Sequence, residues 1–291
     1  MITASLVKEL REKTGAGMLD CKKALEATEA NLDKAIDWLR EKGISKAAKK
    51  VDRIAAEGLA GIKVSGNDAV IVEVNSETDF VAKNEEFISL LNTLLDTLIK
   101  SDAKTIDEAN KIETPEGTIE DLLINKTAKI GEKLSFRRFE KVTKSDNEEF
   151  GSYIHMGGKI AVLSVISGNN AEVAKDVSMQ AAAMRPRYVR REDVEESVIE
   201  HEKEVAKEEL LQRGVPADRL DNAIIGKVNT FYQENCLEDQ AFIKNDKQTI
   251  SKYLKENNCS IIKVVRYEVG EGIEKKEEDF ATEVMNQINN K

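Results

Sequence analysis

The chain has 291 residues, enough for two or three compact units that each have a core of their own. Charged residues make up 34% and aromatic residues 5% of it, and it contains only 3 prolines, a composition that indicates much exposed helix. The net charge of −10 argues against a general nucleic-acid-binding protein, and no apolar stretch of about 18 residues could span a membrane.

The cysteines and the start of the chain predict a cytoplasmic protein. Cys21, Cys236 and Cys259 are odd in number, far apart and not spaced as metal ligands, so they are expected to be reduced thiols. The chain opens on an amphipathic helix rather than on an apolar run, and no secretory signal is expected.

Residues 1–54 are predicted to form an N-terminal three-helix domain with a basic connector. Gly43 is expected to end the third helix, after which the connector is expected to be helical as well. Met18 and Leu19 begin the second helix, where they either complete a small core or form an exposed contact surface. The connector offers a candidate phosphate-binding face, although a solvated charged face is the commoner outcome for such residues: Lys46, Lys49, Lys50 and Arg53.

Residues 55–187 are predicted to form the core of an α+β fold. Its two halves share one plan, in which a strand, a glycine-containing turn and a returning strand lead through a polar corner into a helix. The corners lie at residues 75–78 and 167–170. This weak internal duplication predicts a duplicated core of antiparallel β-sheet plus helices.

The first corner carries the most informative residues of the chain. Thr78 can cap the start of a long amphipathic helix, and Asp79 would lie in its first turn, where the helix dipole favours an acid. Phe80 is a rigid aromatic residue that either fills the protein's own core or is presented to a partner. The residues alone leave both alternatives open.

The last third of the chain is predicted to leave the core and return to it. Residues 188–236 read as an inserted helical hairpin that is too thin to have a core of its own, so it needs packing from the body or from a partner chain. Residues 237–270 are expected to rejoin the core sheet through a strand at 260–269. Residues 271–291 are expected to form a C-terminal helical module.

The sequence contains no motif of a catalytic or cofactor site. It has no Walker or Rossmann glycine pattern, so no direct nucleotide binding is expected. His155 and His201 lack Cys or His partners at ligand spacing, and no metal site or cofactor is expected. A nucleophile elbow is absent too, which makes an enzyme the weaker class. His155, at a strand end, is either a capped or solvated side chain or a surface contact.

Five blocks of sequence resemble the bacterial type of the elongation factor Ts family, in family order and over essentially the whole chain. The most distinctive is Thr-Asp-Phe-Val-Ala-Lys-Asn at residues 78–84. Residues 10–25 resemble the family's N-terminal signature and residues 43–48 its connector. Residues 151–155 resemble its second core half, and residues 266–274 its C-terminal signature.

The resemblance implies a translation factor that exchanges guanine nucleotides on elongation factor Tu, releasing GDP by disturbing the Mg²⁺ and phosphate site of that partner. No covalent chemistry is implied. The hairpin at 188–236 becomes a candidate homodimer surface, because it serves self-association in some members. The implied contacts with elongation factor Tu are Thr78, Asp79, Phe80, Val81, His155, Met18 and Leu19.

Two other classes of function stay open at this point. In a scaffolding protein, Phe80 would be buried and the helical hairpin would be the working part. In an RNA-binding protein, the basic connector would carry the contact, but the acidic total charge makes this the weakest of the three, and no nucleic-acid partner is expected.

Overall fold

The structure is a computed structural model that describes every residue except 1, 15, 17, 49 and 275–291. The chain divides into two compact units. The first comprises residues 1–61, 72–139 and the chain from 268 onward, and the second comprises residues 62–71 and 140–267. None of the helices in the described part is both long enough and apolar enough to cross a membrane.

The N-terminal segment folds as three helices, as predicted. Thr3 caps the first, because its Oγ1 accepts a hydrogen bond from the Leu6 N–H at 3.2 Å. Asn31 caps the third through the Lys34 N–H at 3.0 Å. The helices are α1 (Ala4–Thr14), α2 (Met18–Ala27) and α3 (Leu32–Ala48). Their small core is made of Leu10, Cys21, Ala24, Leu25 and Ala35.

Gly43 does not end the third helix, which corrects the sequence-based expectation. It lies inside α3, where a Cβ atom would stand 3.6 Å from the Cβ of Ala128 on α7 (Ile119–Ile130). The glycine therefore allows α3 and α7 to pack closely rather than acting as a stop signal. The expected helical connector is also shorter than predicted, because α3 ends at Ala48 and residues 50–53 form turns and a bend.

The first sheet has the strand order β1-β2-β5, with β2 in the centre. Its strands are β1 (Glu57–Ser65), β2 (Asp68–Ser76) and β5 (Ser135–Thr143). The predicted helical stripe of the first half lies on α5 (Glu85–Leu98), and it is buried: Phe87, Leu90, Leu91, Leu94, Leu95 and Leu98. The shorter elements of this half are α4 (Asp79–Ala82), α6 (Ile106–Asn110), β3 (Glu113–Thr114) and β4 (Gly117–Thr118).

The second sheet has the order β10-β7-β6, and it repeats the plan of the first. Its hairpin is antiparallel, with His155 opposite Ile160 at the turn end. The strand predicted to rejoin the core does so beside the central strand. The elements are β6 (Glu148–His155), β7 (Ile160–Ser167), α8 (Ala171–Met184) and β10 (Ser260–Glu268). The fold is therefore α+β with a core of two similar halves, as expected.

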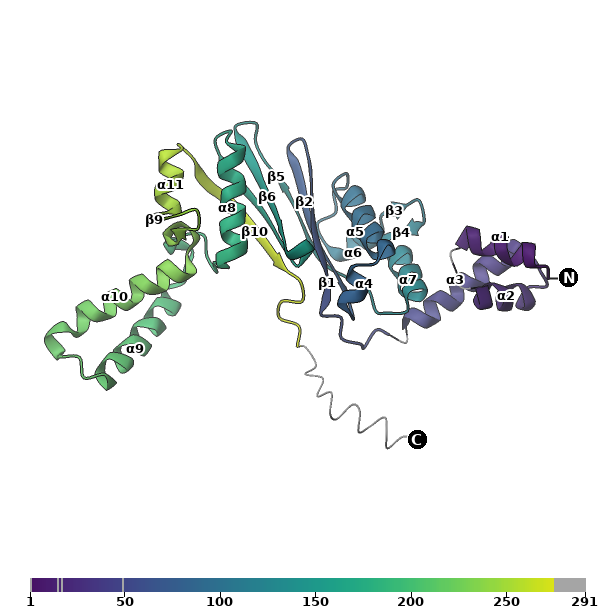
Figure 1. The fold of residues 1–291 in the computed structure, drawn as a ribbon, viewed down its shortest axis with the longest axis horizontal. Helices are drawn as coiled ribbons and strands as arrows, with labels where there is room; N and C mark the ends of the chain where they lie inside the picture. Colours follow the sequence, from purple (N-terminus) through teal and green to yellow (C-terminus); the bar gives the residue numbers. More distant parts are fainter. Residues whose placement is uncertain (1, 15, 17, 49, 275–291) are drawn as a thin grey trace. The chain divides into compact units, whose positions relative to one another are not determined.

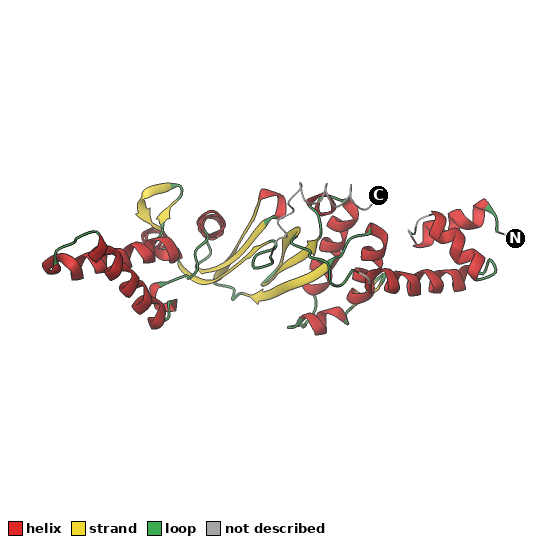
Figure 2. Cartoon of the chain, turned by 90° about the horizontal axis from the view of Figure 1, so that it is seen from below, coloured by secondary structure: helices red, strands yellow, loops and turns green. Residues whose placement is uncertain are grey.

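The predicted helical hairpin consists of α9 (Glu196–Gln212) and α10 (Ala217–Asn235), which lie side by side (Figure 1). In the described part of the chain, the strands lie in the two sheets and in short hairpins (Figure 2). The chain returns through β8 (Ala241–Phe242), β9 (Asn245–Thr249) and α11 (Ile250–Glu256). Of the predicted C-terminal helical module, residues 275–291 lie outside the described part of the chain.

An ion cluster joins α5 to α7 and makes stability depend on pH. Glu86 accepts hydrogen bonds from Lys126 Nζ and Lys129 Nζ, each at 2.7 Å. These bonds, that from Lys126 first, lower the pKa of Glu86 from 4.5 to about 2. A carboxyl group whose pKa is lower in the folded state stabilises the fold above its unfolded pKa, and this contribution is lost as the pH falls.

We therefore expect Glu86→Gln to lower the melting temperature near neutral pH and to lower it progressively less between pH 4.5 and about 2. The effect is modest, below about 1 kcal/mol, because the group is partly solvated. Melting curves of both proteins across this range measure it. Glu85→Gln, on the same helix and exposed, is the control. A difference from wild type that stays constant with pH would contradict the role of this carboxylate.

Candidate functional site

The corner after β2 is a single helical turn rather than the start of one long helix. Thr78 is the N-cap of α4, and its side chain accepts a hydrogen bond from the Val81 N–H at 3.4 Å. The turn ends at Lys83, and Asn84 then caps α5 anew through the Glu86 N–H at 2.8 Å. The two caps separate a short turn from the buried helix, so the turn can present side chains that α5 cannot.

Phe80 is presented to solvent on this turn. It is 79% exposed, whereas Phe87 on the next helix is fully buried. The Nζ of Lys83 lies 5.8 Å from the centroid of the Phe80 ring and 2.7 Å from Oδ2 of Asp79. The alternative in which Phe80 fills the protein's own core is therefore wrong. An exposed aromatic side chain held on a defined turn is typical of a contact surface.

Glu132 fixes the position of the corner at Thr78 through two hydrogen bonds. Its Oε2 accepts a hydrogen bond from the Thr78 N–H at 2.9 Å, and its Oε1 accepts one from the Thr78 hydroxyl at 2.7 Å. Glu132 follows Gly131, whose left-handed backbone (φ 89°) ends α7 and turns the chain toward the corner. Thr78 thus uses its polar groups inside the protein, where they fix the turn that carries Phe80.

A second set of contacts ties the connector after α3 to the same corner. Glu77 accepts hydrogen bonds from the Lys133 N–H at 2.6 Å and from the Arg53 guanidinium at 3.3 Å. The Nζ of Lys133 donates to the carbonyl oxygens of Val51 at 2.5 Å and Arg53 at 2.9 Å. Arg53, one of the candidate phosphate contacts, therefore forms an ion pair with the corner. Sequence reasoning missed Glu132 and Lys133, because each is more than 50 residues from the group it holds.

The role of Glu132 predicts the effect of Glu132→Gln. The amide oxygen can accept from the Thr78 N–H, and its NH₂ can donate to the Thr78 hydroxyl, so both contacts become hydrogen bonds between neutral groups and lose their charge assistance. We expect about tenfold faster hydrogen exchange at residues 78–82, equivalent to about 1.5 kcal/mol. Hydrogen exchange measured by mass spectrometry tests this, with the exposed Glu120→Gln on α7 as control. Unchanged exchange at the corner would show that Glu132 does not hold it.

The other predicted contact residues lie elsewhere in the fold. His155 is the last residue of β6, is half-buried and stacks on Tyr153 with ring centroids 5.9 Å apart. The side chains on either side of it are exposed apolar groups, Ile154 and Met156. His155 belongs to the second compact unit, whereas the Thr78–Val81 turn belongs to the first.

Met18 and Leu19 are exposed at the start of α2, at 61% and 73%. They are not part of the N-terminal core, so of the two alternatives the structure favours exposed side chains. They lie in the same compact unit as Phe80.

Metal binding and thiol reactivity are the two other kinds of chemistry to consider in the described residues. In that part of the chain, no group of three or more His, Cys, Asp and Glu side chains could hold a metal ion. The cysteines are buried and free, and burial raises the pKa of the Cys236 thiol to about 11, so this thiol stays protonated at neutral pH.

The structure is an α+β fold that holds a solvent-exposed phenylalanine on a braced turn, an arrangement typical of proteins that bind a partner through a contact surface. The family model described as Elongation factor TS matches residues 77–271, more than half of the chain. The chain therefore belongs to the elongation factor Ts family, as its sequence motifs indicated. This family implies a guanine-nucleotide exchange factor that acts on elongation factor Tu in translation elongation. The match includes the Phe80 turn and His155, whereas Met18 and Leu19 precede it.

Proposed function

We propose that this protein binds elongation factor Tu through the Phe80 turn and releases GDP from it by disturbing the Mg²⁺ and phosphate site. The observation that carries the proposal is the exposure of Phe80 on a turn fixed by Glu132. A GTPase holds its nucleotide largely through a phosphate loop and a Mg²⁺ ion. An aromatic wedge between helices of the partner shifts the helix that supports the Mg²⁺ ligands, and the hold on GDP weakens.

This mechanism needs no covalent step and no nucleotide bound to the factor itself. The factor binds the nucleotide-free partner best, so factor and nucleotide weaken each other's binding by the same ratio. It speeds exchange in both directions, and the cellular concentrations of GDP and GTP decide which nucleotide is finally bound.

The proposed contacts divide into an anchor and supporting residues. Phe80 is the anchor, and Val81 lies beside it on the same turn. Asp79 contacts the partner once its carboxylate leaves the exposed ion pair with Lys83. His155 supports the contact from the second core half. Met18 and Leu19 add an exposed apolar contact from the N-terminal helices.

The test is release of a fluorescent GDP analogue, mant-GDP, from elongation factor Tu. The GTPase is loaded with the analogue and mixed with increasing amounts of the protein and excess unlabelled GDP. We expect the release rate to rise with concentration and to saturate. Release that is independent of the protein would overturn the proposal.

Self-association through the hairpin at 188–236 is a separate proposal. Three apolar side chains on α9 and α10 are about half exposed: Val205, Leu211 and Ile225, at 48%, 52% and 58%. Sedimentation equilibrium over a range of concentrations tests it, and a monomer throughout would contradict it.

We also propose that the protein works in the cytoplasm without a nucleic-acid partner, in keeping with its net charge of −10. RNA that stays bound to the purified protein at physiological salt would contradict the absence of a nucleic-acid partner.

A further inference from the structure

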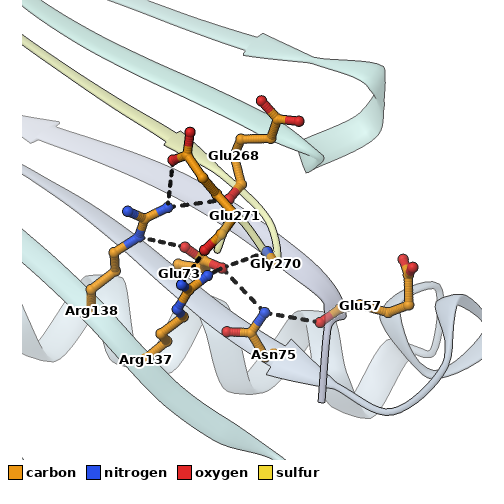
Figure 3. Close-up of polar contacts among 8 residues, drawn as sticks. All are labelled: Glu57, Glu73, Asn75, Arg137, Arg138, Glu268, Gly270 and Glu271. Atoms are coloured by element: carbon orange, nitrogen blue, oxygen red, sulfur yellow. Dashed lines mark hydrogen bonds and ion pairs between the residues drawn. The ribbon is translucent and has the colours of Figure 1, made fainter. Parts of the chain in front are cut away.

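Glu73 is a fully buried carboxylate on β2, five residues before Thr78 in the chain. Four N–H groups are directed at it (Figure 3). Arg137 Nη1 and Asn75 Nδ2 donate to its Oε1 at 3.0 and 3.1 Å, and Arg138 Nε donates to its Oε2 at 2.5 Å. The fourth donor is the backbone N–H of Gly270, at 2.9 Å. Because each of these groups is a donor, only a carboxylate with two acceptor oxygens satisfies all of them.

The same two arginines also hold the backbone that follows β10. Arg138 Nη2 donates to the carbonyl oxygen of Glu268 at 3.1 Å and lies 3.5 Å from the carboxylate of Glu271. Arg137 Nη2 donates to the carbonyl oxygen of Glu271. Glu73, Arg137, Arg138 and residues 268–271 form one connected network, which we call the C-terminal clamp (Figure 3).

Gly270 fits the clamp for a steric reason. Its backbone is left-handed (φ 76°), and a Cβ atom there would stand 2.1 Å from the carbonyl oxygen of Ala56. Gly272 has nearly the same backbone angle (φ 75°), but a Cβ atom on it would meet no atom within 4 Å. The two glycines therefore differ in close approach and not in backbone strain.

An ion network around a fully buried carboxylate is costly, because the charge must leave water, and apolar side chains of similar volume often stabilise a fold equally well. What charges provide is a fixed geometry, because a carboxylate and two guanidinium groups satisfy one another in few arrangements. In the C-terminal clamp, this geometry joins two chain segments. One is the strand that leads to the Phe80 turn, and the other is the segment that continues into residues 275–291.

We infer that Glu73 is a positioning residue of the exchange factor: the C-terminal clamp fixes the segment 268–271 to the strand that carries the Phe80 turn. This inference rests on the proposed function. The clamp holds the strand that carries the Phe80 turn in one orientation, which lowers the ordering cost of binding the partner. Loss of the clamp should weaken binding of the partner and leave the step that expels GDP intact.

Three variants of the full chain test the inference by hydrogen exchange. In Glu73→Gln, the amide NH₂ faces one of the N–H donors whichever way the amide is turned. Gly270→Ala displaces the segment 268–271 and changes no charged group. Gly272→Ala is the matched control. We expect about tenfold faster hydrogen exchange at residues 268–271 in the first two variants. In the third we expect a clearly smaller increase, because only the backbone strain of alanine at a left-handed position is added there. Unchanged exchange on α5 and α7 shows that each variant is folded, and Gly270→Ala carries the test if Glu73→Gln does not fold.

Release of mant-GDP from elongation factor Tu provides the functional measurement. For Glu73→Gln and Gly270→Ala, we expect the half-saturating concentration of the factor to rise about tenfold, while the maximal release rate stays within about twofold of wild type. The inference is wrong if Gly270→Ala and Gly272→Ala have the same half-saturating concentration. It is also wrong if hydrogen exchange shows that the segment 268–271 is loosened while the half-saturating concentration stays that of wild type. If the wild-type protein does not speed GDP release from elongation factor Tu, the proposed function is wrong. The hydrogen-exchange measurements test the clamp independently of that result.

Discussion

Replacing Phe80 with alanine is expected to lower the efficiency of GDP release from elongation factor Tu by about 30-fold or more, because truncating an aromatic anchor costs an interface on the order of 2 kcal/mol. The side chain is 79% exposed, so its removal takes little apolar surface out of the protein's own packing. The melting temperature should therefore stay close to that of wild type. Stopped-flow measurement of mant-GDP release over a range of factor concentrations gives the efficiency as the initial slope.

The matched control removes a different exposed apolar side chain from the same unit. Ile88 lies on α5 and is 40% exposed, and Ile88→Ala should release GDP within about twofold of the wild-type rate. A folded Phe80→Ala protein with wild-type activity would remove Phe80 from the mechanism. An equal loss in both variants would point to a general effect on α4 and α5 rather than to the aromatic anchor.

The elements around this anchor could be predicted from sequence because their signals are local. The apolar run of β2, the cap at Thr78 and the leucine stripe of α5 each depend on neighbours within a few residues. The exposure of Phe80 could not be predicted in this way. Phe80 and Phe87 follow the same strand, yet one is exposed and the other fully buried, because the second cap at Asn84 separates their helices.

The residues that hold the site were not predictable for a related reason. Glu132 contacts Thr78 across 54 positions, and Gly270 contacts Glu73 across 197. Such pairs have no spacing signature in a single sequence. Gly43 shows the converse error, in which a local stop signal was overridden by the packing of α3 on α7.

Gly151→Ala is expected to destabilise the second core half by about 3 kcal/mol or more, which corresponds to a fall in melting temperature of about 10 °C. Gly151 lies in the middle of β6, opposite Ser164 of β7. A Cβ atom there would stand 2.0 Å from the backbone carbonyl oxygen of Ala174 on α8 and 2.5 Å from Oγ of Ser164. A helix carbonyl cannot rotate away as a side chain can, so α8 must move off the sheet.

Gly226→Ala is the control, because it makes the same chemical change where space is free. Gly226 lies on α10, and a Cβ atom on it would meet nothing within 4 Å. Alanine in a helix interior is more stable than glycine by about 0.5–1 kcal/mol, so this variant should melt slightly higher than wild type. Thermal unfolding followed by circular dichroism should thus give shifts of opposite sign for the two variants. A Gly151→Ala protein that melts like wild type would mean that α8 does not pack on β6 as closely as the structure has it.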